Sequence, residues 1–433
     1  SYYFAPEAVP YNPHLAKDQR ESLQLFGKNN AKWFDHYGFS YFTREVFDAF
    51  YPGYGASWPS YYGSVAMTYE QASARGLLVK RSDETTMHFR DSVWHHFVSS
   101  ISTSETAAVN RKKLLDDFYA YRQSAIEEGR TESIKAYILP RVGNTSSIDK
   151  LVAVLNYQGV EIMQAKAGFR SGGREYPVGS YVISLAQPTK RLIRTLMDVD
   201  VPMEESFVEE QERRRSKRIG DQIYDVTAWS MPLMYNIESV PSSQTVLGDF
   251  ELVNPVMTPP GKINGGEAEV AYLVPWGTQG AGRLLASALQ TGLRVSSSDL
   301  AFAQEDRRYP AGTLIFLVKD NPTNLHANLS RIAKFSGAEV FAVNTSWVIE
   351  GPNFGSNNVV YMPKPRIAMA WDQPTRSNNA GATRFVIERQ IGYPVTPIRT
   401  AQMGRADLSG FDVILLPSPG FSGGGYKGVL GDN

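Results

Sequence analysis

Two stretches in the first part of the chain carry the hydrophobic spacing of helices. Residues 17–37 (KDQRESLQLFGKNNAKWFDHY) predict one helix within residues 1–63, a segment otherwise rich in aromatic and turn residues. Residues 90–129 predict a longer helix that ends at a glycine and has a solvated NRKKLLDD section. Its apolar stripe, which should face a core, consists of Val93, Phe97, Ile101 and Ala108.

After Gly129 the pattern changes to alternating strands and helices. The order begins with the strand IKAYILP and the helix SSIDKLVAVLNYQG, and it recurs from AEVAYLVP onward. Ala136-Tyr137 matches Ala271-Tyr272, and the Tyr-Pro-x-Gly at residues 176–179 matches the one at 309–312, at offsets of 135 and 133 residues. We infer an internal duplication of an α/β unit, with the charged run at residues 209–218 as a solvated connector.

A further unit begins after Pro365. RIAMAW predicts a strand, GATRFVIERQIGYP a helix and FDVILLPS a second strand. This order is that of a parallel α/β domain, and we expect the chain to end before the third strand. The loop GFSGGGYKG follows at the edge of the sheet where such folds bind ligands if they bind any.

Composition narrows the chemistry. Lys+Arg and Asp+Glu are equal at 44 each, so no net charge would attract nucleic acid, and no apolar run is long enough to span a membrane. There is no cysteine, which excludes disulfides, thiolate nucleophiles and cysteine metal sites. The six histidines show no metal-ligand spacing, so no residue is assigned as a metal ligand. Oligomeric state stays open.

One carboxylate stands out because of its position. The apolar run VAMTY, residues 65–69, predicts a short buried strand that ends at Glu70. On residue type alone, Glu70 is most simply a salt-bridge partner of Arg75. A general base, by contrast, needs a rigid element that aims it, and a strand end would provide one. The aromatic loop at residues 50–63 could bring phenols to the same place, although a packed loop is the simpler alternative.

Residues 47–76, FDAFYPGYGASWPSYYGSVAMTYEQASARG, resemble the last part of the catalytic domain in zinc carboxypeptidases of the carboxypeptidase A type. In that family a loop with a substrate-binding tyrosine and a tryptophan-containing segment precede a strand that ends in the catalytic glutamate. Glu70 follows Tyr51 by 19 residues and Trp58 by 12. NPHL, YFTREVFDAFYPGYG and MTYEQAS are closer still to a bacterial subgroup of large, secreted peptidases with a C-terminal glutamine-amidotransferase-like domain.

The resemblance implies roles for two residues. Glu70 would be the general base and acid, and Tyr51 would be the mobile phenol that contacts the substrate, with Tyr54 as the alternative. Arg75 follows Glu70 where the family often has polar or charged residues, and we interpret it, apart from the resemblance, as a supporting salt-bridge partner. The zinc ligands of the family would lie upstream of residue 1, so the 433-residue chain is expected to bind no catalytic zinc and hydrolyse nothing in isolation, whereas the full-length protein should do both.

The implied fold class is α/β with four segments. Residues 1–129 would be the C-terminal part of the carboxypeptidase-like domain, 130–255 the first α/β repeat with its connector, and 256–364 the second repeat. Residues 365–433 would begin a flavodoxin-like or glutamine-amidotransferase-like parallel domain. Because amidotransferase chemistry needs a cysteine nucleophile, we expect a non-catalytic accessory domain there.

The leading hypothesis is a piece of a secreted or periplasmic bacterial zinc metallocarboxypeptidase that hydrolyses C-terminal peptide bonds. One alternative is a non-catalytic peptide- or glycan-binding scaffold with a peptidase-like domain, and another is an amidase or endopeptidase variant of the same fold. Side-chain preference of the substrate is open. The loop between Tyr51 and Trp58 contains no acid, which disfavours selectivity for Lys or Arg.

Overall fold

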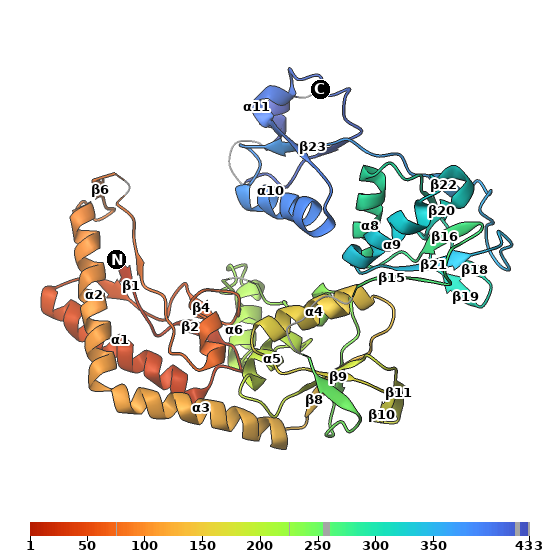
Figure 1. Ribbon diagram of the computed structural model, residues 1–433. Coiled ribbons are helices and arrows are strands. Elements are labelled where there is room, and N and C mark those ends of the chain that lie inside the picture. Colours follow the sequence, from red (N-terminus) through yellow and green to blue (C-terminus); the bar gives the residue numbers. More distant parts are fainter. Residues whose placement is uncertain (75, 225, 254–259, 421–424, 432–433) are drawn as a thin grey trace. The chain divides into compact units, whose positions relative to one another are not determined.

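The computed structural model describes residues 1–74, 76–224, 226–253, 260–420 and 425–431, and these residues form a mixed α/β fold (Figure 1). Their contacts divide the chain into two compact units. The first consists of Ser1–Val142 with Leu151–Val256, and the second of Gly143–Lys150 with Met257–Asn433. The first unit covers most of residues 1–255, and the second covers most of residues 256–433 together with residues 143–150.

The first unit begins with short strands around one long helix. The helix, α1, spans Lys17–Tyr37 and confirms the predicted bounds. The strands and the 3-10 helix of this part are β1 (Tyr2–Tyr3), β2 (Ala8–Tyr11), β3 (Tyr41–Phe42), β4 (Asp48–Ala49), η1 (Trp58–Tyr62), β5 (Glu70–Gln71), β6 (Leu78–Lys80) and β7 (Thr86–His88). They pair in the orders β3-β1-β5, β2-β4 and β6-β7. The first eleven residues therefore contribute one strand to each of two sheets.

The long helix predicted for residues 90–129 is two helices in the structure. Helix α2 spans Phe89–Val109 and α3 spans Arg111–Thr131, and they run in different directions (Figure 1). Asn110 separates them, with φ −101°, ψ 15° and a side chain whose Nδ2 donates to the Thr106 carbonyl at 2.9 Å. This bond competes with continuation of the helix.

The apolar stripe of α2 does not face a core. Val93, Phe97 and Ile101 are 52%, 52% and 40% exposed, and Ala108 is also exposed. The buried face instead carries small polar residues, because α1 packs closely there and Asn29 Nδ2 donates to the Ser102 carbonyl at 3.0 Å. The expected orientation was therefore wrong.

Gly129 does not end α3. It lies inside the helix, and a Cβ built on it would come within 1.9 Å of the Leu185 carbonyl oxygen. The residue thus permits a close approach between the helix and the following α/β segment, where sequence pattern suggested a helix stop.

The two repeated segments contain the same elements in the same order. The first segment has β8 (Ala136–Leu139), α4 (Thr145–Tyr157), β9 (Met163–Ala165), β10 (Phe169–Ser171), β11 (Arg174–Tyr176), β12 (Tyr181–Ser184) and α5 (Lys190–Met197). The second has β16 (Ala271–Val274), α8 (Gln279–Gln290), β17 (Ser296–Ser298), β18 (Phe302–Gln304), β19 (Arg307–Tyr309), β20 (Leu314–Leu317) and α9 (Leu325–Ser336). In each segment one short strand ends at the tyrosine of Tyr-Pro-x-Gly and a second short strand follows the motif.

Strand register agrees with the offsets in the sequence. The five-stranded sheet has the order β13-β8-β12-β9-β14, and the six-stranded sheet has the order β15-β21-β16-β20-β17-β22. Ala136 pairs with Ser184 and Ala271 with Leu317, so the offsets of 135 and 133 are preserved in the antiparallel pairing. Phe169 stacks on Tyr176 and Phe302 on Tyr309, each at 5.1 Å between ring centroids. The shared register supports a duplication.

The remaining elements extend these sheets or connect them. In the first unit they are α6 (Glu205–Ser216), α7 (Met231–Met234), β13 (Val240–Ser242) and β14 (Phe250–Leu252). In the second unit they are β15 (Lys262–Asn264), the 3-10 helix η2 (Val318–Asp320), β21 (Glu339–Val343) and β22 (Val359–Tyr361). In α6 only Phe207 and Gln211 are buried, as expected for a solvated connector.

The last part of the chain has one strand more than expected. The three strands β24 (Thr396–Arg399), β23 (Ile367–Trp371) and β25 (Val413–Leu415) are parallel and lie in that order. The strand β24, TPIR, is short and contains proline, which hides it from a pattern search. The helical elements are α10 (Ser377–Arg384), the π-helix η3 (Phe385–Ile391), α11 (Thr400–Met403) and α12 (Lys427–Leu430). Residues 421–424 of the glycine-rich loop expected as a ligand edge lie outside the described residues.

Candidate functional site

Glu70 lies on a strand, but the strand begins with it rather than ending at it. Glu70 pairs with Tyr3 and Gln71 with Tyr2 across the antiparallel β1–β5 ladder. Residues 65–69, predicted as a buried strand, have no regular structure and are half-buried. Because β1 is only two residues long, it offers pairing partners to only two residues of this segment. Tyr69 is held by side-chain bonds instead, to Thr103 Oγ1 at 2.6 Å and from Asn30 Nδ2 at 3.2 Å.

A cavity of about 320 Å³ opens beside Glu70. Its wall includes Tyr54, Ser57 and Tyr61 from the aromatic loop and Tyr224 from the segment after α6, and Glu70, which is exposed, is among its lining residues. A carboxylate on a short strand next to a cavity of this size can hold or transfer a proton on a bound ligand.

The aromatic loop is packed, and it places two tyrosines differently. Tyr54 lines the cavity, whereas Tyr51 does not; the Tyr51 ring meets Tyr54 at 5.4 Å and Trp229 at 5.8 Å between centroids. The loop is anchored by Asn12 Nδ2, which donates to the Phe50 carbonyl at 3.0 Å. The structure thus brings Tyr54, the alternative residue, to Glu70 and leaves Tyr51 against Trp229.

Two further acidic residues line the same cavity, and no sequence pattern pointed to them. Glu7 immediately precedes β2, and Asp48 begins β4; the parallel pairing of Ala8 with Asp48 brings them together. Glu70 arrives through β5, whose partner β1 lies only four residues before Glu7. The first strands of the chain therefore assemble three acids that are far apart in sequence.

Glu7 is buried without a partner for one oxygen. It is 7% exposed, and its Oε2 has no hydrogen-bond partner. Burial raises the pKa of the Glu7 carboxyl from its ordinary value of 4.5 to about 7, since desolvation penalises the charged form. Glu7 in turn raises the pKa of Tyr3 and of Tyr11, although the burial of each tyrosine is the larger cause of its shift.

Replacing Glu7 with glutamine should stabilise the protein in a pH-dependent way. The folded-state pKa lies above the unfolded one, so the folded state favours the protonated form and loses stability as pH rises from about 4.5 through about 7. We expect Glu7→Gln to change the free energy of unfolding little near pH 4 and to raise it by about 3 kcal/mol near pH 8. Urea denaturation at both pH values measures this change in the free energy of unfolding. An equal effect of the substitution at both pH values would show that burial does not raise the pKa of Glu7.

A surface acid provides the control for that measurement. Glu161 is exposed and does not line the cavity, so Glu161→Gln should leave the stability unchanged within about 0.5 kcal/mol at either pH. The Asp48 and Glu70 carboxyls, which face the same cavity, are present in both variants and so cancel from the comparison.

The histidines near Glu70 serve packing. His95 is buried, its Nδ1 lies 2.5 Å from Gln71 Oε1, and burial lowers its pKa. His96 Nδ1 lies 2.8 Å from the Tyr2 hydroxyl. Among the described residues no three His, Asp or Glu side chains gather closely enough to hold a metal ion. The described side chains therefore do not by themselves fit a zinc site, and none of them is assigned as a ligand.

Arg75, the expected salt-bridge partner of Glu70, lies outside the described residues. Gln71 and Tyr69, on either side of Glu70, are fixed by their own contacts with α2, at His95 and Thr103. The position of Glu70 is thus set by its two neighbours and by the β1 ladder.

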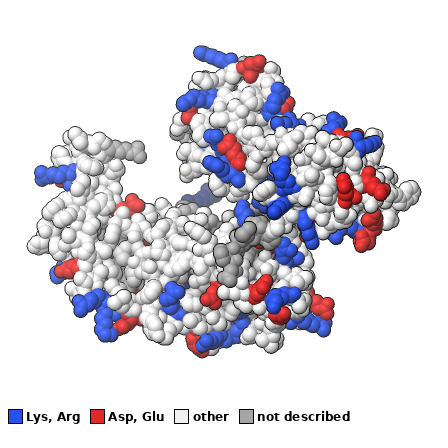
Figure 2. All heavy atoms as spheres, in the orientation of Figure 1, with Lys and Arg blue, Asp and Glu red and all other residues white. Residues whose placement is uncertain are grey.

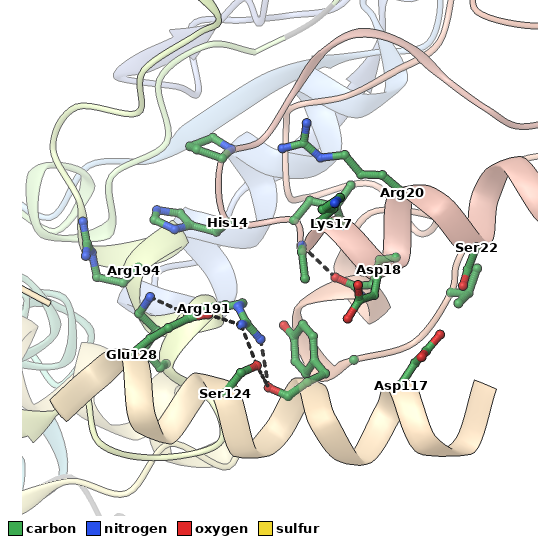
Figure 3. A pocket seen from close by; sticks show the side chains of 18 of the residues that line it. His14, Lys17, Asp18, Arg20, Ser22, Asp117, Ser124, Glu128, Arg191 and Arg194 are labelled. Carbon is green, nitrogen blue, oxygen red and sulfur yellow. Dashed lines mark hydrogen bonds and ion pairs between the residues drawn. The ribbon is translucent and has the colours of Figure 1, made fainter. Parts of the chain in front are cut away.

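A second, larger cavity of about 720 Å³ lies between α1 and α3, which face it from opposite sides (Figure 3). Its wall carries acidic and basic side chains in similar numbers, including Lys17, Asp18, Arg20, Asp117 and Arg191. Such a wall has no net preference for either sign of charge, so we assign it no ligand.

An ion-pair network closes one side of this larger cavity and joins α3 to α5. Lys190 Nζ lies 2.9 Å from Glu128 Oε2 and 2.6 Å from Glu132 Oε1, and Arg191 also pairs with Glu128. Lys190 is only 4% exposed at its side chain. Although burial opposes it, hydrogen bonding from Lys190 and the charge of Arg191 lower the pKa of Glu128. We call these pairs, with Arg194, Asp198 and His14, the α3–α5 network.

The far end of the α3–α5 network involves residues from the N-terminal segment. Asp198 Oδ2 accepts from Arg194 Nε at 2.9 Å and lies 3.3 Å from His14 Nε2, and Tyr137 donates to Asp198 Oδ1. Despite the opposing effect of burial, these bonds lower the pKa of Asp198. The network links residues before and after residue 129, where a domain boundary was expected, and both lie in the first compact unit.

Positive and negative side chains are interspersed over the visible face of the molecule (Figure 2). Among the helices in the described residues, none has the length and apolar character needed to cross a membrane. Comparison of the chain with protein-family models, with curated proteins and with solved structures found no match.

Proposed function

We propose that this chain is the part of a zinc metallocarboxypeptidase that carries its general base and acid, Glu70. The observation that supports this best is the placement of Glu70, an exposed residue that lines a cavity together with two tyrosines of the preceding loop, Tyr54 and Tyr61. The resemblance of residues 47–76 to that family supplies the reaction class. Location of the enzyme outside the cytoplasm is part of the same proposal.

The chemistry asked of Glu70 is proton transfer at a scissile peptide bond. Its carboxylate accepts a proton from the water that attacks the carbonyl carbon, and it returns that proton to the nitrogen of the leaving amine. The two-residue ladder to β1 and the neighbours Tyr69 and Gln71 hold it for both transfers. Zinc would supply electrophilic activation; its ligands are not among the groups gathered here, so we derive no step through it.

A loop phenol would contact the substrate. Tyr51 is proposed for this on the family spacing, and Tyr54 is the competing residue because it already lines the cavity. The variants Tyr51→Phe and Tyr54→Phe distinguish the two residues. Loss of the hydroxyl that binds substrate should raise KM, and loss of the other hydroxyl should leave KM unchanged.

Release of C-terminal residues tests the proposal. The full-length protein should release the last amino acid from peptides with a free carboxylate and not from the same peptides with a C-terminal amide; mass spectrometry of the products distinguishes these. A chelator should abolish release, and Zn²⁺ should restore it. Cleavage of the amidated peptides would favour an amidase or endopeptidase, and peptide binding without any cleavage would favour the scaffold hypothesis.

A further inference from the structure

The cavity beside Glu70 has an acidic and aromatic wall. Glu7, Asp48 and Glu70 line it, and no described residue that lines it is Lys, Arg or His. Three tyrosines, a phenylalanine, two leucines and several small residues complete the wall. The volume of about 320 Å³ is at the lower end of ligand pockets, which run from about 300 to 1,000 Å³. A cavity of this size suits one amino-acid side chain rather than a large cofactor.

Glu7 is the residue in this wall that the fold does not explain. It is 93% buried, given its exposure of 7%, and Oε2 lacks a hydrogen-bond partner although it belongs to a side chain lining the cavity. Burying a carboxyl group without a partner is unfavourable for folding. A residue that costs stability and faces a cavity is typical of a binding site, where the ligand supplies the missing partner.

The charges in the wall select among possible ligands. An anionic group would be repelled by three carboxyls, and an apolar group would leave Glu7 Oε2 unpaired. A cationic group would donate to Glu7 and be attracted by Asp48 and Glu70 as well. The rings of Tyr54 and Tyr224, 6.2 Å apart between centroids, add faces against which a cation is also favoured.

We propose that this cavity binds a cationic side chain, an ammonium or guanidinium group, and that Glu7 is the specificity-determining residue that receives it. The inference rests on the proposed function, in which the cavity beside Glu70 holds the residue to be released. It reverses the expectation drawn from the loop between Tyr51 and Trp58, because the acids come from β2 and β4 instead of the loop.

Binding to the 433-residue chain tests the site without catalysis. Ligand-observed NMR titration with L-lysine, L-arginine and L-norleucine should show lysine or arginine binding about tenfold or more tightly than norleucine, which has an uncharged chain. Glu7→Gln should remove that preference and leave the affinity for norleucine unchanged. Glu161→Gln, the surface control, should keep the preference. Equal affinities for all three probes, or a preference that survives in Glu7→Gln, would overturn the proposal.

Activity of the full-length protein separates this inference from the function it rests on. Peptides that end in Lys, Arg or norleucine are compared by kcat/KM, with and without Glu7→Gln. If all three residues are released equally fast and Glu7→Gln has no effect, the cationic site is refuted while the carboxypeptidase stands. If the chain prefers lysine in binding but the full-length protein releases no residue, the carboxypeptidase is refuted while the cationic site stands.

Discussion

Replacing Glu70 with glutamine in the full-length protein is expected to lower kcat by about 10²–10⁴-fold, the usual contribution of a positioned general base and acid. Glutamine keeps the size of the side chain and can still bond to a ligand, but it can neither accept nor return a proton. Because the proposed function places most substrate contacts in the loop and the rest of the cavity wall, KM should change much less than kcat. Steady-state kinetics on a peptide with a free C terminus measures both.

The fold should not be affected by this change. Glu70 is exposed, so Glu70→Gln should alter the free energy of unfolding by no more than about 0.5 kcal/mol. Glu161→Gln, which removes another exposed carboxylate, should leave kcat unchanged. Wild-type turnover in Glu70→Gln, with the protein folded, would remove Glu70 from the mechanism.

Replacing Asp198 with asparagine should destabilise the first unit by about 3 kcal/mol at neutral pH. The side chain is 11% exposed and accepts from Arg194 and Tyr137, and His14 lies beside it. Removing one partner of a mostly buried pair leaves the other charge uncompensated, which typically costs about 3–5 kcal/mol. We take the lower end because Arg194 keeps a second partner, Glu132, at 3.0 Å.

The effect of Asp198→Asn should depend on pH with a definite sign. The pKa of Asp198 is lowered in the folded protein, so its stabilising contribution is present above its ordinary value of 3.8 and is lost as pH falls further. Urea denaturation should therefore show a larger difference from wild type at about pH 7 than at about pH 3. Asp200→Asn is the control, since Asp200 is exposed and forms no ion pair in the part of the chain described; a similar loss of stability there would contradict the assignment.

The pattern of hydrophobic and polar residues predicted those elements whose signals lie within one short stretch of sequence. Helix α1 has the predicted bounds, and the repeat seen in Tyr-Pro-x-Gly corresponds to sheets with the same register. The pattern misjudged α2 because four of the six buried residues on its packed face are Ser or Thr, which only the approach of α1 reveals. It also placed a helix end at Gly129, where the glycine instead admits the Leu185 carbonyl.

The candidate site divides in the same way. The sequence by itself singled out Glu70 and the aromatic loop, because they are neighbours along the chain, and it determined that no thiol chemistry is available. Only the tertiary structure decided that Tyr54 rather than Tyr51 lines the cavity and that Glu7 and Asp48 join Glu70 there. The reason is physical: β-ladders bring residues together across long separations, and burial, which alters the pKa of Glu7, exists only once those ladders have formed.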